Sequence, residues 1–298
     1  MSDLSPHARG LLITTAGVLV LTPDSLLIRL VTADPWTLTF WRGVLYAFGM
    51  SAAVAAFYGR RTRQQFLALG KGGLLLGVIF GIGKVTFILS ITNTTAANTL
   101  FIVSTSPLFA ALAAWVMMRE PVAPRTWLAM AFALLGIGVI ASGGFDGGGI
   151  IGNVAALLTA VVLGTSFALA RRYRERNVIP AMALSGLISA LLVLPLASPL
   201  TVVASDLAAL AIMGLVVLPL SFSLIFIGPR YIPAPEVSLV LLLEAVLGPY
   251  WVWLALGEEP GARTLLGGTI VLATLAAHSA LRLVGERGGA VAADATKN

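Results

Sequence analysis

The sequence predicts an all-α polytopic membrane protein with ten transmembrane helices, arranged as a 5+5 inverted-topology repeat with both termini in the cytoplasm. Three observations lead to this prediction. Hydrophobic residues make up 58% of the 298 residues and charged residues only 11%, whereas roughly a quarter of the residues of a soluble domain are charged. Apolar runs long enough to cross ~30 Å of hydrocarbon recur along the chain. Basic residues collect in alternate connections between these runs.

We identify ten apolar segments as candidate spans. They cover approximately residues 10–31, 36–58, 72–91, 95–118, 126–142, 150–170, 179–198, 207–228, 233–256 and 262–284. Because the connections are short, consecutive helices are expected to be antiparallel neighbours. The longest connection, residues 59–71, leaves no room for a soluble domain.

The distribution of Lys and Arg gives the orientation. With the N-terminus in the cytoplasm, 15 of the 19 basic residues fall on the inner side. This is the positive-inside pattern, so both termini are predicted to be cytoplasmic and the chain to be a multi-pass protein of the inner (plasma) membrane. The same distribution accounts for the net charge of +6 without a nucleic-acid partner. No cleavable signal peptide is apparent, because the N-terminus lacks a clear basic region.

An internal repeat supports the division into halves. A shift of 138 residues without a gap overlays the ninth segment and its surroundings on the fourth, and the least common matches are Trp253 with Trp115, Glu258 with Glu120 and Arg263 with Arg125. We interpret this as a duplication, with repeats at residues 1–146 and 147–298. Since five spans per repeat is an odd number, the second repeat must enter the membrane inverted. Inverted repeats are typical of transporters, although any duplicated membrane protein would show a repeat.

Several motifs resemble a known family. They are Ala96-Ala97-Asn98 through Ser106-Pro107-Leu108 to Glu120, its partner Leu243-Glu244 through Gly257-Glu258, and Asp34-Pro35 followed by Phe40-Trp41-Arg42. Together they resemble the EamA-type repeats of the drug/metabolite transporter superfamily, over about residues 10–284. The resemblance implies a metabolite exporter in which the first four helices of each half line a central cavity and the fifth is peripheral.

The resemblance also carries one departure and one expectation about substrate. Family members often have a proline near position 245, where this chain has Ala245, so we expect the kink of the ninth helix a turn later, at Pro249. Exporters of amino acids, aromatic ones included, are among the best-known members. The plan of this sequence is similar to theirs.

Three charges fall inside spans at one level in the outer half of the membrane. They are Asp24 on the first helix, Arg42 on the second and Lys84 on the third. A charge inside a span costs a few kcal/mol and needs a partner or a wet cavity. One hypothesis is a site for a zwitterion, with Lys84 or Arg42 for its carboxylate and Asp24 for its amine. The alternative is an ion-pair network that holds the three helices together and meets no substrate.

Glu244, near the middle of the ninth span, is the candidate for substrate contact and for proton coupling. The alternative is a protonated carboxyl group that is hydrogen-bonded between helices. Asn98, Trp41 and Phe101 complete the predicted substrate site, the two aromatic residues as possible stacking partners for a substrate ring. Four prolines that lie among small or polar residues are candidates for gating kinks, namely Pro23, Pro107, Pro219 and Pro249. Ordinary proline enrichment in membrane helices is the other explanation.

We therefore expect a secondary transporter that exports small metabolites, with amino acids as the expected class, by alternating access around a cavity near Asp24, Lys84, Asn98, Phe101 and Glu244. The chain shows no ATP-binding motif, so gradients must drive transport. Export of another metabolite or an organic cation is the alternative. An intramembrane enzyme is a distant alternative, because the chain has no Cys and only two His, neither near a carboxylate along the sequence. No cofactor or metal is predicted, and the functional unit is expected to be a monomer in lipid.

Overall fold

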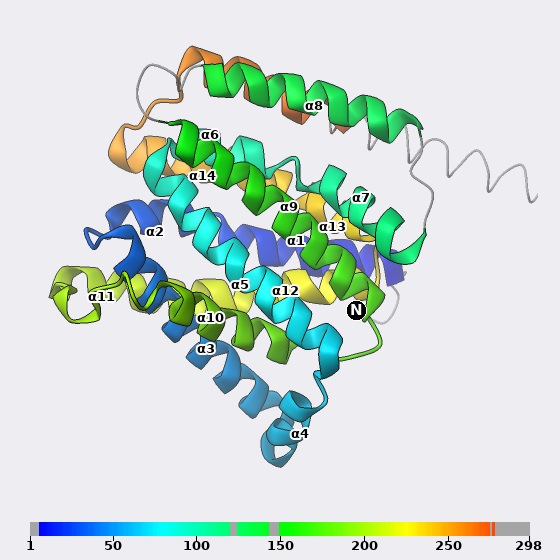
Figure 1. Ribbon diagram of the computed structural model, residues 1–298, viewed down its shortest axis with the longest axis vertical. Coiled ribbons are helices and arrows are strands. Elements are labelled where there is room, and N and C mark those ends of the chain that lie inside the picture. Colours follow the sequence, from blue (N-terminus) through cyan, green and yellow to red (C-terminus); the bar gives the residue numbers. More distant parts are fainter. Residues whose placement is uncertain (1–5, 120–123, 143–148, 275, 278–298) are drawn as a thin grey trace, which may run out of the picture.

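The computed structural model describes residues 6–119, 124–142, 149–274 and 276–277, which form helices and turns without a strand (Figure 1). The first half contains α1 (Pro6–Leu21), α2 (Asp24–Leu30), α3 (Pro35–Tyr58), η1 (Gly59–Arg61), α4 (Thr62–Leu67), α5 (Gly70–Asn93), α6 (Ala96–Val103), α7 (Ser106–Met118) and α8 (Pro124–Ser142). The second half contains α9 (Ile150–Arg172), α10 (Ile179–Val193), η2 (Pro199–Thr201), α11 (Ala204–Ala211), the π-helix η3 (Ile212–Val217), α12 (Leu218–Ile227), η4 (Gly228–Arg230), α13 (Ala234–Val240), α14 (Leu242–Leu256) and a helix at Ala262–Thr274. The all-α prediction is confirmed. The predicted boundary at 146/147 lies outside the described residues.

Seven helical segments of the described chain are long and apolar enough to cross a membrane. They are Pro6–Leu30, Pro35–Leu67, Gly70–Asn93, Ala96–Met118, Ile150–Arg172, Ala204–Arg230 and Glu236–Leu256. Three shorter apolar helices, Trp127–Ile140, Ile179–Val193 and Ala262–Thr274, lie at the remaining predicted positions. The chain is therefore a polytopic membrane protein. That all ten segments cross, and that both termini are cytoplasmic, stay predictions.

Helix α3 shows how the local sequence sets the start of a span. The Asp34 carboxylate accepts hydrogen bonds from the backbone N–H groups of Trp36 (3.0 Å) and Thr37 (3.1 Å), and Pro35 occupies the first helical turn. Slight desolvation acts to raise the pKa of the exposed Asp34 carboxyl, but the hydrogen bonds from Thr37 and Trp36 outweigh it and hold this pKa below its ordinary value.

Most interruptions of the spans occur at the predicted prolines. The first span breaks at Thr22-Pro23, and the fourth breaks at Ser104-Thr105 just before Pro107. The π-helix η3 ends at Val217, and Pro219 lies in the first turn of α12, which follows directly. The ninth span differs from the expectation, because it is interrupted at Leu241 and α14 continues through Pro249. Leu241 has no proline beside it, so the sequence carries no signal of this break.

The structure agrees with the internal repeat at one diagnostic pair of residues. Helix α7 ends at Arg119 with φ 56°, and α14 ends at Gly257 with φ 69°. The shift of 138 residues places Gly257 on Arg119. A residue with left-handed backbone conformation at the C-terminal end of a helix is common when that residue is glycine, but it is rare when it is arginine. The two halves therefore end these helices with the same backbone conformation, despite different side chains.

Contacts between helices also have the reciprocity of two related halves. Helix α1, the first predicted segment, packs on α12, the eighth. In the same way α9, which corresponds to α1 in the second half, packs on α5, which corresponds to α12 in the first half. Helix α7 of the fourth segment contacts α9 of the sixth. Its counterparts in the ninth segment, α13 and α14, likewise contact α1 of the first segment. The second and seventh segments, α3 and α10, contact each other directly. Such a pattern is expected when two bundles are related by a two-fold axis.

Glycine permits the closest of these approaches. A Cβ added at Gly43 on α3 would lie 2.6 Å from the carbonyl oxygen of Gly186 on α10, and a Cβ at Gly186 would lie 2.6 Å from that of Gly43. The backbones cross where neither residue has a side chain, as small residues allow in membrane helix pairs. Helix α8 lies apart from this bundle at one edge of the molecule (Figure 1), where Gly136 meets Gly267 of the last described helix.

Candidate functional site

A cavity lies between the two halves. It is lined by Leu21, Asp24, Arg42, Phe80, Gly83, Lys84, Phe87, Val103, Thr159, Val162, Leu163, Phe222, Leu241 and Glu244. Its cavity volume is about 60 Å³, which is enough for a few water molecules, since one needs roughly 10–15 Å³. A solute of several heavy atoms therefore enters only if the lining side chains move.

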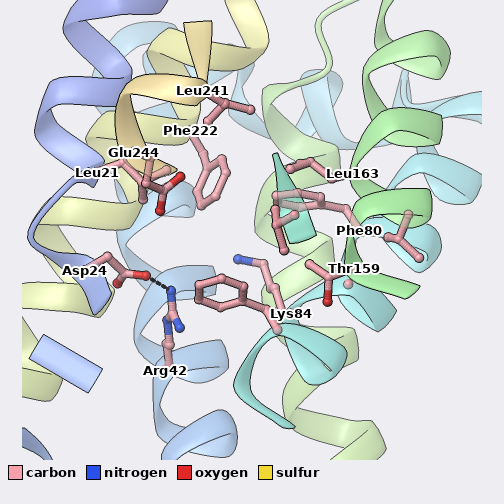
Figure 2. Close-up of a pocket in the computed structure, with 14 residues that line it drawn as sticks. Leu21, Asp24, Arg42, Phe80, Lys84, Thr159, Leu163, Phe222, Leu241 and Glu244 are labelled. Carbon is pink, nitrogen blue, oxygen red and sulfur yellow. Dashed lines mark hydrogen bonds and ion pairs between the residues drawn. The ribbon is translucent and has the colours of Figure 1, made fainter. Parts of the chain in front are cut away.

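Asp24 and Arg42 form a buried ion pair on one side of the cavity (Figure 2). Asp24 is the first residue of α2, directly after the break at Thr22-Pro23, which turns its side chain toward α3. The Asp24 side chain is 1% exposed and that of Arg42 is 12% exposed. The Arg42 guanidinium also lies 5.6 Å from the centre of the Phe87 ring. One carboxylate oxygen, Asp24 Oδ1, has no hydrogen-bond partner among the described residues.

Lys84 extends from α5 into a group of aromatic rings. Its Nζ lies 3.3 Å from the centre of the Tyr46 ring, 5.1 Å from that of Phe80 and 5.4 Å from that of Phe222. Within the described part of the chain, Lys84 makes no ion pair with a carboxylate. The ammonium group is therefore held by ring faces, an arrangement that stabilises cations in sites with little water.

Glu244 contributes the second carboxylate of the cavity. It lies in the first turn of α14, directly after the interruption at Leu241, and is 9% exposed. Figure 2 shows Glu244 and Lys84 directed into the same space from opposite sides. In the described residues Glu244 has no ion-pair partner, so its carboxylate faces the cavity without a fixed counter-charge.

The structure thus brings together four of the predicted residues, Asp24, Arg42, Lys84 and Glu244, and places the other three elsewhere. The indole N–H of Trp41 donates to the Pro199 carbonyl (2.9 Å). Asn98 accepts a hydrogen bond from Thr264 (2.6 Å) and donates to Thr94 Oγ1 (3.0 Å).

Phe101 lines a different, apolar pocket, together with Pro249, Tyr250 and Trp253. None of Trp41, Asn98 and Phe101 lines the charged cavity. Which residues share a cavity depends on how each helix is rotated about its axis. That rotation follows from packing, and the apolar sequence does not encode it strongly.

The aromatic residues near Lys84, namely Phe80, Phe87, Phe222 and Tyr46, were not predicted from the sequence. Phe80 and Phe87 flank Lys84 at positions i−4 and i+3 of α5, a spacing that places all three side chains on one face of a helix. This spacing is the signal that could have found them. Phe222 comes from α12 and Tyr46 from α3, and no spacing connects them with Lys84.

A second set of polar contacts ties the ends of several helices together at the predicted outer side. Arg29 forms an ion pair with Glu258 (Nε–Oε2 3.3 Å) and donates from Nη2 to the Thr94 carbonyl (2.7 Å). The other Glu258 oxygen accepts from the Ala96 N–H (2.9 Å) at the start of α6. We call Arg29, Glu258, Thr94 and Ala96 the outer latch. It joins α2, the beginning of α6 and the connection after α14.

Arginine contacts also join helix ends at the predicted inner end. Arg171 donates to the Pro229 carbonyl (3.0 Å), and Arg172 donates to the Met117 carbonyl. These bonds join the end of α9 to η4 and to the end of α7. No group of three His, Cys, Asp or Glu residues that could hold a metal occurs in the described ranges.

The fold and the cavity define a class of protein. A polytopic bundle of apolar helices that surrounds a small charged cavity is typical of membrane transporters, whose substrate sites lie between repeats near the bilayer midplane. The EamA-like transporter family model matches residues 10–142 and 150–279, so the chain belongs to the EamA-like transporter family. It is therefore a membrane transporter of small molecules.

Solved structures agree with this fold. One crystal structure superposes with a TM-score of 0.70 at 17% sequence identity, and the match covers 92% of this chain and 98% of that chain. At this identity the likeness supports the fold alone. No curated protein matches the sequence.

Proposed function

We propose that the protein is a secondary transporter that exports small zwitterionic metabolites, with amino acids as the expected substrates. The observation that carries this proposal is the charge balance of the cavity. Asp24 and Glu244 supply two negative groups, and Arg42 and Lys84 supply two positive groups. A zwitterion adds no net charge to such a site, so its burial leaves no group without a counter-charge.

The proposed mechanism is alternating access between two inverted repeats, residues 1–146 and 147–298. The outer latch would open when α2 moves away from the connection after α14, while the bonds of Arg171 and Arg172 hold the inner end closed. The exchange of these two sets of contacts would expose the cavity to one side at a time. The helix breaks at Thr22-Pro23, Ser104-Thr105 and Leu241 supply positions at which half-helices can tilt.

Glu244 is our candidate for coupling transport to protons. It faces the cavity without a fixed partner, unlike Asp24, which is already paired with Arg42. We expect the Glu244→Gln variant to lose the pH dependence of transport, whereas Glu175→Gln, on an exposed turn, should keep it. An unchanged pH profile in Glu244→Gln would remove the coupling role.

One observation favours a second candidate, the export of organic cations. The aromatic rings of Phe80, Phe87 and Phe222 form much of the cavity wall, and ring faces attract organic ammonium ions. Against this, Lys84 and Arg42 already bring two positive charges into the cavity. Zwitterions are therefore the better match for the site as it stands.

Flux measurements on the purified chain in proteoliposomes would test the proposal. Radiolabelled counterflow with a panel of amino acids, other metabolites and organic cations should show flux for at least one amino acid. That flux should be lost in Asp24→Asn and Lys84→Met but kept in Lys71→Met, at an exposed lysine. Flux of another solute class with none for any amino acid would refute the substrate assignment and leave the transporter assignment intact.

The outer latch has its own test, because the chain contains no cysteine. A single cysteine in place of buried Ser25 on α2 would report access from outside. We expect Glu258→Gln to increase its labelling by an impermeant maleimide several-fold. The matched control is Glu259→Gln, which changes the adjacent, exposed carboxylate. Equal labelling in both variants would show that the latch does not close the outer end.

We further propose that the monomer in the inner membrane is the functional unit.

A further inference from the structure

The aromatic rings around Lys84 have the geometry of a cation-binding pocket. Tyr46 from α3, Phe80 from α5 and Phe222 from α12 surround the Lys84 Nζ at 3.3, 5.1 and 5.4 Å from their ring centres. All three distances lie within the ≈ 6 Å over which a ring face attracts a cation. We call Tyr46, Phe80 and Phe222 the aromatic pocket. Two of its members, Phe80 and Phe222, line the central cavity.

The aromatic pocket is held in place by packing between its own rings. Phe222 meets Tyr46 edge to face (centroids 6.2 Å apart, planes at 84°) and meets Phe80 in the same way (5.1 Å, 77°). Phe226 packs behind Phe80 (5.0 Å, 74°), and Tyr46 is fully buried. Such edge-to-face pairs stabilise the arrangement of the rings around the Lys84 ammonium. Because the rings are already fixed, a cation loses little binding energy in ordering them.

The carboxylates of the cavity do not compete for this position. Asp24 is engaged by Arg42, and no ion pair joins Glu244 to Lys84 in the described chain. The Lys84 ammonium nevertheless lies over the ring of Tyr46, not against either carboxylate. The ammonium therefore rests on ring faces without an ion pair, as quaternary ammonium groups do in aromatic cages.

We propose that the aromatic pocket is a binding site for small organic ammonium ions, which Lys84 occupies as an internal ligand. The tethered ammonium excludes soluble organic cations from the cavity, because both would need the same ring faces. Lys84 is thus a residue that determines specificity: its removal opens the aromatic pocket to a free cation of similar size. This goes beyond the proposed transport of zwitterions and does not depend on it.

Binding of radiolabelled tetramethylammonium to the full chain in lipid nanodiscs tests the proposal without requiring transport. We expect Lys84→Ala to bind tetramethylammonium at least tenfold more tightly than the unmodified protein does. Lys71→Ala, which removes an exposed lysine and the same charge, should bind no better than the unmodified protein. Adding Phe222→Leu to Lys84→Ala removes one ring and should abolish most of the gain.

Two results would overturn the proposal. One is a folded, monodisperse Lys84→Ala protein that binds tetramethylammonium no better than the unmodified chain. The other is a gain that persists when Phe222→Leu is added, because binding would then occur elsewhere. If Lys84→Ala does not fold, Lys84→Val keeps an apolar side chain in the span but is too short to occupy the ring faces, and we expect at least a threefold gain. Absence of that gain would equally refute the aromatic pocket as a cation site.

Discussion

Removal of one partner of the Asp24–Arg42 ion pair should destabilise the fold far more than removal of both. The two side chains are 1% and 12% exposed, so neither charge can be solvated by bulk water when its partner is lost. Arg42→Leu is the more severe change, because it leaves a buried carboxylate whose Oδ1 already lacks a hydrogen-bond partner among the described residues. Asp24→Asn leaves the guanidinium with the Phe87 ring and the cavity, and should cost less.

The expected magnitudes follow from the behaviour of buried ion pairs. Breaking such a pair by removing one partner costs about 3–5 kcal/mol, whereas replacing both by neutral groups is often close to neutral. We therefore expect Arg42→Leu to lower the free energy of unfolding by about 3–4 kcal/mol. The double variant Asp24→Asn/Arg42→Leu should recover at least ~2 kcal/mol of the summed single losses, which is a large coupling for two residues in contact.

The assay is unfolding of the purified protein by SDS in mixed micelles, monitored by tryptophan fluorescence, for the unmodified chain, both single variants and the double variant. Lys71→Met, at an exposed position, is the control for removal of a charge. If the loss in the double variant equals the sum of the two single losses, the charges are not coupled. The ion pair would then not explain why these residues are tolerated inside the spans. A double variant that is stable but inactive in counterflow would show that the pair is kept for substrate.

Three further predictions follow from other contacts. Gly43→Val should reduce the yield of monodisperse protein several-fold in size-exclusion chromatography, because its Cβ would lie 2.6 Å from a backbone oxygen of α10, whereas Gly138→Ala, whose Cβ would meet nothing within 4 Å, should not. Asp34→Ala removes the cap of α3 and should lower the free energy of unfolding by about 1 kcal/mol in the same SDS titration. Since the folded pKa of Asp34 is lowered, the stabilisation by this cap is present above the ordinary pKa of Asp34 and is lost as the pH falls through the lowered value. A loss of stability that is the same at every pH would contradict this prediction. Thr264→Val removes the 2.6 Å hydrogen bond to buried Asn98 and should cost about 1 kcal/mol while leaving transport unchanged; a changed substrate preference would instead return Asn98 to the substrate site.

The sequence predicts this fold well because the signals that define it are strong in apolar sequence. Hydropathy alone locates the helical segments, and the shift of 138 residues relates Arg119 to Gly257, whose backbones share the left-handed conformation. Charged residues within spans are similarly informative. A charge in hydrocarbon requires a partner or a wet cavity, so Asp24, Arg42, Lys84 and Glu244 are driven to the same place.

The rest of the site has no comparable signal. The chain contains 13 phenylalanines, and nothing distinguishes Phe222 from those that face lipid or core. Trp41 and Phe101 were predicted near substrate from their depth in the span, but depth does not give the rotation of a helix about its axis. In a helix that is apolar all round, small differences in packing set that rotation. The break at Leu241, shortly before Glu244, likewise has no proline beside it to announce it in the sequence.

The charges of the cavity break the symmetry that the repeat imposes on the backbone. Asp24, Arg42 and Lys84 all come from the first half, and Glu244 comes from the second. Two related bundles can exchange shapes during alternating access only if their packing surfaces stay alike, as α3 and α10 do at their glycine crossing. A bound zwitterion, in contrast, has one positive and one negative end. A site of alike charges from both halves would bind it equally well in two orientations. In the proposed mechanism, the unequal distribution of charge would select one of these orientations, so the duplicated scaffold would supply the motion and the departures from duplication the recognition.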